Sequence, residues 1–162
     1  MLASALVLGV VAGLLAGGRA SRLAELHIRW WPLLVGGLAL RLIAPAFGEF
    51  AAILYVAGFA GVVAVAAADR AIAGMPLIAL GAALNALVVA ANGGMPVDPG
   101  ALEAAGAAMP DDRLHILLDE TTRLAPLADV IPLAVVRSVY SIGDVVLAAG
   151  GFWVPFAWLR RR

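Results

Sequence analysis

The chain has no cysteine and no lysine, and only 14% of its 162 residues are charged. The absence of cysteine excludes disulfide bonds and thiolate metal sites. Eleven basic residues, all arginine, balance eleven acidic ones, so the net charge gives no reason to expect a nucleic-acid partner. The sequence contains no phosphate loop, dinucleotide fingerprint or serine nucleophile elbow, and no motif identifies a cofactor.

Apolar residues are abundant: 64% of the chain is hydrophobic and its mean hydropathy is +1.01. Five apolar stretches have about the length of a membrane span, and helices are expected because a single span must satisfy its backbone internally. The predicted spans are about 2–18, 30–47, 50–68, 75–91 and 135–158. We therefore predict an all-α, polytopic transmembrane helical bundle forming a single domain over residues 1–162, with a partly helical extracytoplasmic loop at about 92–134.

The arginines predict how the chain is oriented. They follow the first and third spans and end the chain: Arg19, Arg22, Arg29, Arg70, Arg160, Arg161 and Arg162. By the positive-inside rule these segments are cytoplasmic, so the N-terminus is outside and the C-terminus inside a multi-pass protein of the cell inner (plasma) membrane. The acidic bias of the loop at 92–134 agrees with this orientation. The first span is not typical of a signal peptide, because no basic residue precedes it.

Two further patterns refine the bundle. Trp30, Trp31, Trp153 and Trp158 lie near the predicted cytoplasmic ends and are expected to anchor the interface. The segment Pro32–Arg41 aligns without gaps on Pro76–Asn85. This weak repeat predicts two helical hairpins, spans one–two and three–four, followed by a fifth helix, and it places Arg41 and Asn85 at equivalent depths.

Asp144 lies inside the fifth apolar stretch, where an ionisable side chain costs roughly 2.5–3.5 kcal/mol and indicates a functional site with a partner. Arg41 is the expected partner. The helical rise places Arg41, Asn85 and Asp144 roughly 10 Å below the outer surface. Arg137, Ser141 and Asp144 have the spacing of one helix face. We therefore predict a polar pocket, open to the outside, between the second, fourth and fifth spans.

The predicted ligand-binding residues of this pocket are Arg41, Asn85, Asn92, Arg137, Ser141 and Asp144. A lipid headgroup, a quinone or a small anion would suit them, because arginine pairs with phosphate and carboxylate through its planar fork. Alternatively, Arg41 and Asp144 form only an interhelical ion pair, and the protein is a membrane accessory subunit with a protein partner. The Gly- and Ala-rich helices could also pack as a homo-oligomer, which a transporter or channel would need.

The loop at 92–134 contains several local signals. Asn92–Val97 predicts a sharp exit from the fourth span, and Asp98 with Pro99 predicts the start of a short helix. Asp111–Leu118 is expected to begin a second, amphipathic helix, and Leu124–Pro132 is an apolar, Pro-broken segment that could act as a lid.

A hydrolase or transferase at the membrane surface is the alternative function, with Asp144, Asp129 and His115 as the candidate catalytic residues. His115 and Asp119 would share a helix face, which is compatible with an acid–base pair. Two possible ligands are too few to predict a metal site, and none is predicted.

Several segments also carry a family resemblance. They are Asn92–Val97, Ala101–Gly106, His115, Thr122–Leu124, Leu127–Pro132 and Ser141–Asp144. Together they resemble an uncharacterised bacterial family of small polytopic membrane proteins, known only as a domain of unknown function. The resemblance covers most of the chain, is strongest over residues 85–150, and implies about five helices and no assigned activity.

A local resemblance concerns Tyr140–Val145, which is similar to the last-helix aspartate motif of lipoprotein signal peptidase, a membrane aspartyl protease. Asn92–Gly94 is similar to a second motif of that family, and Asp129 would be the second aspartate. Two carboxylates that share a proton could activate a water molecule. However, Ser141 and Ile142 stand where that family has asparagine, and the motif around its other aspartate is absent here.

Overall fold

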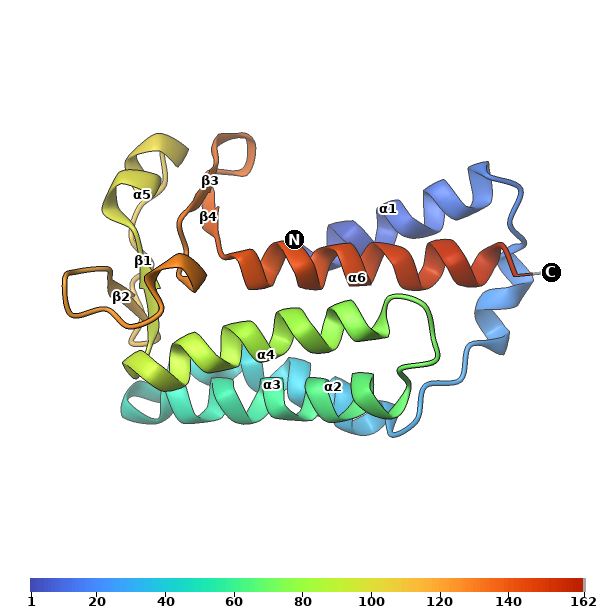
Figure 1. Ribbon diagram of the computed structural model, residues 1–162, viewed down its shortest axis with the longest axis horizontal. Helices are drawn as coiled ribbons and strands as arrows, with labels where there is room; N and C mark the ends of the chain where they lie inside the picture. The colour runs from blue at the N-terminus through green and yellow to red at the C-terminus, as the bar shows by residue number, and fades with distance from the viewer. Residues whose placement is uncertain (162) are drawn as a thin grey trace.

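The computed structural model describes residues 1–161 and is 66% helical (Figure 1). The α-helices are α1 (Leu2–Leu15), α2 (Trp31–Ile43), α3 (Ala51–Ala68), α4 (Met75–Asn92), α5 (Pro99–Ala105) and α6 (Ile142–Leu159). The 3₁₀ turns are η1 (Ala20–Glu25), η2 (Ala44–Phe50), η3 (Ala125–Leu127) and η4 (Ala134–Val136). The strands are β1 (Met95–Val97), β2 (His115–Leu117), β3 (Ile131–Leu133) and β4 (Ser138–Tyr140). The prediction of a mostly helical chain is confirmed, although two small sheets interrupt it.

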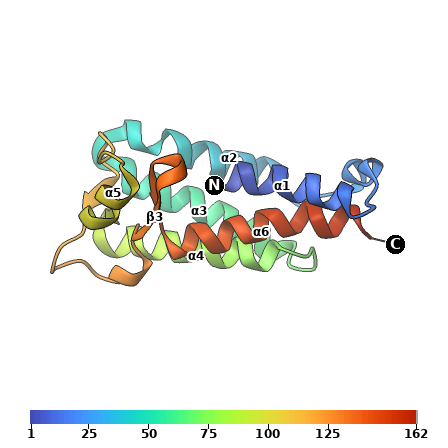
Figure 2. The same ribbon diagram turned by 90° about the horizontal axis from the view of Figure 1, so that it is seen from above.

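The five long helices pack side by side in the order α1–α6–α4–α3–α2. Figures 1 and 2 together show that this row is curved, with α1 and α2 at its two ends on the same side of the bundle. Glycines allow the close approach of α4 and α6, because a Cβ on Gly81 would meet the backbone of Gly143, and one on Gly74 would meet Gly150. Small residues at helix contacts are typical of membrane bundles.

The predicted hairpin of the first two helices is wrong. α1 packs along α6, whereas α2 packs on α3. The physical reason is the fit of small residues: a Cβ on Gly9 would collide with the carbonyl of Phe152, and one on Gly13 would meet Leu159. The segment at residues 16–30, which contains only the turn η1, is long enough to let α1 lie at the other end of the row from α2.

Three helical segments are long and apolar enough to cross a membrane: Trp31–Ala68, Met75–Asn92 and Ile142–Leu159. The first folds back on itself at Gly48, whose φ is +55°, so that α2 and α3 lie antiparallel. α1 has 14 residues, which corresponds to about 21 Å by the helical rise. The length and composition of these segments therefore suggest that the chain is a membrane protein.

The last helix does not extend over the whole predicted span 135–158. Residues 131–140 form the antiparallel hairpin β3–β4, and α6 begins only at Ile142. Ser141 and Asp144 explain the difference, since they form a capping box that starts the helix there. Arg137 lies in the hairpin with a φ of +49° and so cannot share a helix face with them.

The segment at residues 93–140, called the outer segment after its predicted side of the membrane, is held together by its strands. β1 pairs with β2 in parallel, and Asp129 continues the pairing by bridging to Val97. The predicted short helix is confirmed as α5, with Asp98 as its N-cap. The predicted second helix is wrong, because Asp112 accepts hydrogen bonds from the backbone of Leu114 and His115 and so diverts the chain into a turn followed by β2.

The arginine-bearing segments meet at the opposite end of the bundle from these strands (Figure 1). Arg19 N donates to Leu159 O, Trp158 Nε1 donates to Arg22 O, and Arg29 N donates to Asp69 Oδ2. Trp30 and Trp31 are exposed at this end. Arg162, which the orientation argument also used, lies outside the described residues.

Candidate functional site

A buried hydrogen-bonded cluster joins α4 to the start of α6. Asn85 on α4 is its centre: Asn85 Nδ2 donates to Asp144 Oδ1 at 2.9 Å, and Ser141 Oγ donates to Asn85 Oδ1 at 2.8 Å. Asn85 and Ser141 are both fully buried. A Cβ on Gly143 would collide with the Asn85 amide, so only glycine fits at that position. The cluster therefore depends on four residues that fit closely together.

Asp144 is largely satisfied by its own helix. Ser141 Oγ accepts from Asp144 N at 2.9 Å, and Asp144 Oδ2 accepts from Ser141 N at 3.4 Å. A carboxylate in the first turn is also stabilised by the helix dipole. With Asn85 on its other oxygen, Asp144 serves first to start α6 and hold it against α4.

Arg41 on α2 reaches this cluster but is only loosely bound to it. Its Nη2 lies 4.0 Å from Asp144 Oδ1, beyond hydrogen-bonding distance, and its Nε donates to Tyr55 OH at 3.4 Å. The guanidinium carbon lies 5.6 Å from the ring centre of Tyr55 and 5.1 Å from that of Phe59. The predicted Arg41–Asp144 pair thus exists as a long contact, and most of the guanidinium donors have no partner among the described residues.

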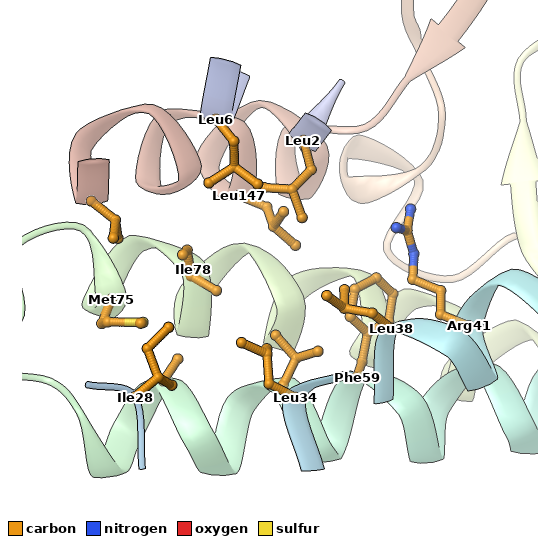
Figure 3. Close-up of a pocket in the computed structure, with 13 residues that line it drawn as sticks. Leu2, Leu6, Ile28, Leu34, Leu38, Arg41, Phe59, Met75, Ile78 and Leu147 are labelled. Carbon is orange, nitrogen blue, oxygen red and sulfur yellow. The ribbon is translucent and has the colours of Figure 1, made fainter. Parts of the chain in front are cut away.

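An apolar groove of about 100 Å³ runs from Arg41 along the inside of the curved row (Figure 3). Leu2 and Leu6 on α1 form one wall, and Leu34 and Leu38 on α2 form the other. α3, α4 and α6 line the floor with further apolar side chains. Arg41 is the one charged residue among the described residues that line the groove. The groove is therefore apolar along its length and cationic at one end.

Asp129 lies near this cluster from the outer segment. It is 7% exposed, and its Oδ1 has no hydrogen-bond partner in the described part of the chain. Burial and the charge of Asp144 together raise the pKa of Asp129 to about 8, although the positive charge of Arg41 lowers it. Asp129 is therefore protonated at neutral pH and can donate a hydrogen bond.

Asn92 and Arg137 lie outside the cluster. Asn92 ends α4: its Nδ2 donates to Val88 O and Arg123 O, and its Oδ1 accepts from Arg123 N. Arg137 Nε donates to Gly106 O at 2.9 Å, which joins the β3–β4 hairpin to the end of α5. Asn92 and Arg137 therefore organise the outer segment, away from Asp144.

His115 pairs with Asp112 rather than with Asp119. Its Nδ1 lies 2.9 Å from both Asp112 oxygens. Burial raises the pKa of Asp112, but the hydrogen bonds from His115 and Leu114 outweigh it and leave the pKa below its ordinary value. The side chain of Asp119 instead accepts from Thr121 and Thr122, which lowers its pKa. The predicted helical pairing of His115 with Asp119 is wrong because this segment is not a helix.

Sequence reasoning missed Tyr55 and Phe59, the aromatic neighbours of Arg41. Tyr55 is a polar aromatic residue inside a strongly apolar run, and that was the available signal. Within residues 1–161, no three His, Asp or Glu side chains come close enough together to hold a metal ion.

Comparison with protein families gives one informative result. The model of a family of unknown function, DUF5317, matches residues 25–156, so the chain belongs to this family. Comparison with curated proteins and with solved structures gives no match. The family membership agrees with the resemblance found in the sequence and assigns no activity.

Proposed function

We propose that this DUF5317 member is a membrane protein that binds an anionic amphiphile, with the apolar chain in the groove and a phosphate or carboxylate head on Arg41. The observation that carries the proposal is the apolar groove that ends on a loosely paired arginine. The other expected ligands are a quinone and an ordinary lipid headgroup. The mass of the bound adduct, measured in the experiment below, would identify either of them.

The contacts of Arg41 support the placement of the ligand's phosphate or carboxylate head on this residue. Arg41 is half-buried and has no close anionic partner. Such a cation is costly in a membrane, and the cost falls when an anion binds. The fork of an arginine matches a phosphate or carboxylate with two parallel hydrogen bonds. Asp144 supplies a counter-charge only at 4.0 Å, while its own oxygens are bound by Asn85 and Ser141. An incoming anion would thus find donors on Arg41 that the protein has not used.

The groove supports the chain position. From Leu34 to Arg41 the α2 wall is seven residues, or about 10 Å by the helical rise. α1 and α2 are the ends of the row, so an apolar chain could enter between them from the bilayer without unfolding a helix contact. An acyl or isoprenyl chain would cover the apolar lining of the groove, which is the usual driving force for such ligands.

For the membrane arrangement, we propose five crossings by α1, α2, α3, α4 and α6, with the N-terminus outside and the C-terminus in the cytoplasm of the inner membrane. The clustering of arginines at one end and the acidic outer segment at the other support this orientation. α1 is short for a span, and local bilayer thinning or tilt of the neighbouring helices would accommodate it. Arg41 and the outer segment then lie towards the external side.

Native mass spectrometry of gently extracted protein tests the proposal. We expect wild type to carry an adduct with the mass of an anionic amphiphile, and Arg41→Gln to lose it while remaining folded. Asp144→Asn should keep the adduct but lose stability, because Asp144 is bound mainly by its neighbours. Arg113→Gln, an exposed arginine away from the groove, is the matched control. Equal adducts on wild type and Arg41→Gln would refute the head position.

An enzyme remains the second candidate, because a protonated Asp129 could act as a general acid beside a second carboxyl group, that of Asp144. His115 does not support the enzyme as an acid–base partner of Asp119, because it pairs with Asp112. If Asp129→Asn carries an adduct of larger mass than wild type does, that adduct is an unprocessed substrate. The protein is then an enzyme acting on that amphiphile. An identical adduct on both supports binding alone.

A further inference from the structure

The outer segment contains a second cavity, which has no lining residue in common with the groove. Its volume is about 190 Å³, more than ten times the roughly 10–15 Å³ that one water molecule needs. α5 and the residues after it form one side, and β1, β2, Asp129 and the β3–β4 hairpin complete the lining. The titratable side chains that line it are His115, Asp129 and Arg137.

Arg137 supplies a positive charge with spare donors. Its Nε donates to Gly106 O, which fixes the position of the side chain. Its two terminal amino groups make no hydrogen bond or ion pair with the described residues. A guanidinium held through Nε still has two parallel N–H groups with which to bind an oxyanion.

Asp129 supplies a donor rather than a second charge. Its side chain is more than nine-tenths buried and its Oδ1 has no partner. An unpartnered buried polar atom is destabilising unless a ligand or solvent satisfies it. Because burial keeps this carboxyl protonated at neutral pH, it can donate to an anion that a carboxylate would repel.

His115 is oriented by Asp112. A carboxylate can only accept, so Nδ1 carries the proton that it donates to Asp112 at 2.9 Å. Nε2 is then left for the cavity. Asp112 is thereby satisfied by His115 and by two backbone N–H groups, and it does not line the cavity.

We propose that this outer cavity is a second site, which binds a small oxyanion through Arg137 and Asp129 from the external side. The chemistry suits a phosphate, sulfate or carboxylate group, either as a free anion or as the head of a lipid. The cavity and the groove have no lining residue in common, and Arg41 and Asp144 act on Asp129 only through their charges.

Isothermal titration of the full chain in detergent tests this proposal, with sulfate and acetate as probes whose charge is constant from pH 7 to 9. Wild type should bind at pH 7, and Arg137→Gln should weaken binding at least tenfold. Arg113→Gln, on the same segment but outside the cavity, should not. Dihexanoyl phosphatidic acid is a third probe: if it alone binds and Arg137→Gln loses it, the source is a lipid headgroup.

A pH series separates the role of Asp129. Wild-type affinity should fall from pH 7 to 9 as Asp129 loses its proton, whereas Asp129→Asn should bind at both values because an amide still donates. Arg41→Gln should bind sulfate like wild type, so failure of the groove proposal would leave this result unchanged. The proposal is overturned if no probe binds wild type, or if Arg137→Gln and Arg113→Gln bind equally.

Discussion

Replacing Asn85 with alanine should weaken the contact between α4 and α6. Asn85 is 0% exposed and both ends of its amide are bound, one to Asp144 and one to Ser141. Water cannot reach this position to replace the lost hydrogen bonds. The substitution therefore removes the one polar residue of α4 that joins the two helices at this depth.

The magnitude follows from the two hydrogen bonds. In soluble proteins a neutral bond contributes about 1 kcal/mol and a bond to a charged group about 1.5–3, which sums to about 2.5–4 kcal/mol. Interhelical hydrogen bonds in a bilayer average about 0.6 kcal/mol each, which gives a lower bound of about 1.2. Ser141 and Asp144 keep their mutual capping bonds, so neither is left wholly unsatisfied. We expect a loss of about 1–4 kcal/mol in the free energy of unfolding.

Reversible unfolding in mixed detergent micelles measures this loss. Asn92→Ala is the matched control: it removes an asparagine from the same helix, but at the outer end, where water can take over its hydrogen bonds. The free energy of unfolding should decrease less in Asn92→Ala than in Asn85→Ala. The account of the cluster is refuted if Asn85→Ala is as stable as wild type, or if the two variants lose equal stability.

Three further outcomes are expected. Asp129 keeps its proton in the folded protein up to about pH 8, whereas the unfolded chain loses it near pH 4. The free energy of unfolding should therefore decrease as the pH rises from about 4 to about 8. Asp129→Asn should flatten that part of a stability–pH series. Gly143→Ala should prevent proper assembly, because its Cβ collides with Asn85, whereas Gly36→Ala, which meets no atom within 4 Å, should be neutral or slightly stabilising in the same thermal assay. An impermeant maleimide should label Asp111→Cys from outside intact cells; labelling only after the inner face is opened would contradict the proposed orientation.

The central polar cluster was predictable because charge inside an apolar stretch is rare. Arg41 and Asp144 stood out for that reason, and the weak repeat put Asn85 at the depth of Arg41. Asp144 contacts both of the others, Asn85 by a hydrogen bond of 2.9 Å and Arg41 at 4.0 Å, as similar depths require. Asp98 and Pro99 likewise predicted α5 correctly, since capping is a local property of the sequence.

Other features depend on contacts between distant segments, which the periodicity of the sequence does not reveal. The spacing of Arg137, Ser141 and Asp144 fits a helix face only if the helix already exists at Arg137. The Ser141–Asp144 capping box was the signal that it begins later. The order of the helices depends on which glycine faces fit together, and the raised pKa of Asp129 depends on burial that distant segments create.

The groove is tested most directly by photo-crosslinking with a phosphatidic acid that carries a diazirine in its acyl chain. After reconstitution and irradiation, mass spectrometry locates the adducts. Our account predicts adducts on groove residues such as Leu34, Leu38 and Leu147, and their loss in Arg41→Gln. Adducts spread equally over outward-facing residues such as Val35 and Ile53, unchanged in Arg41→Gln, would contradict it.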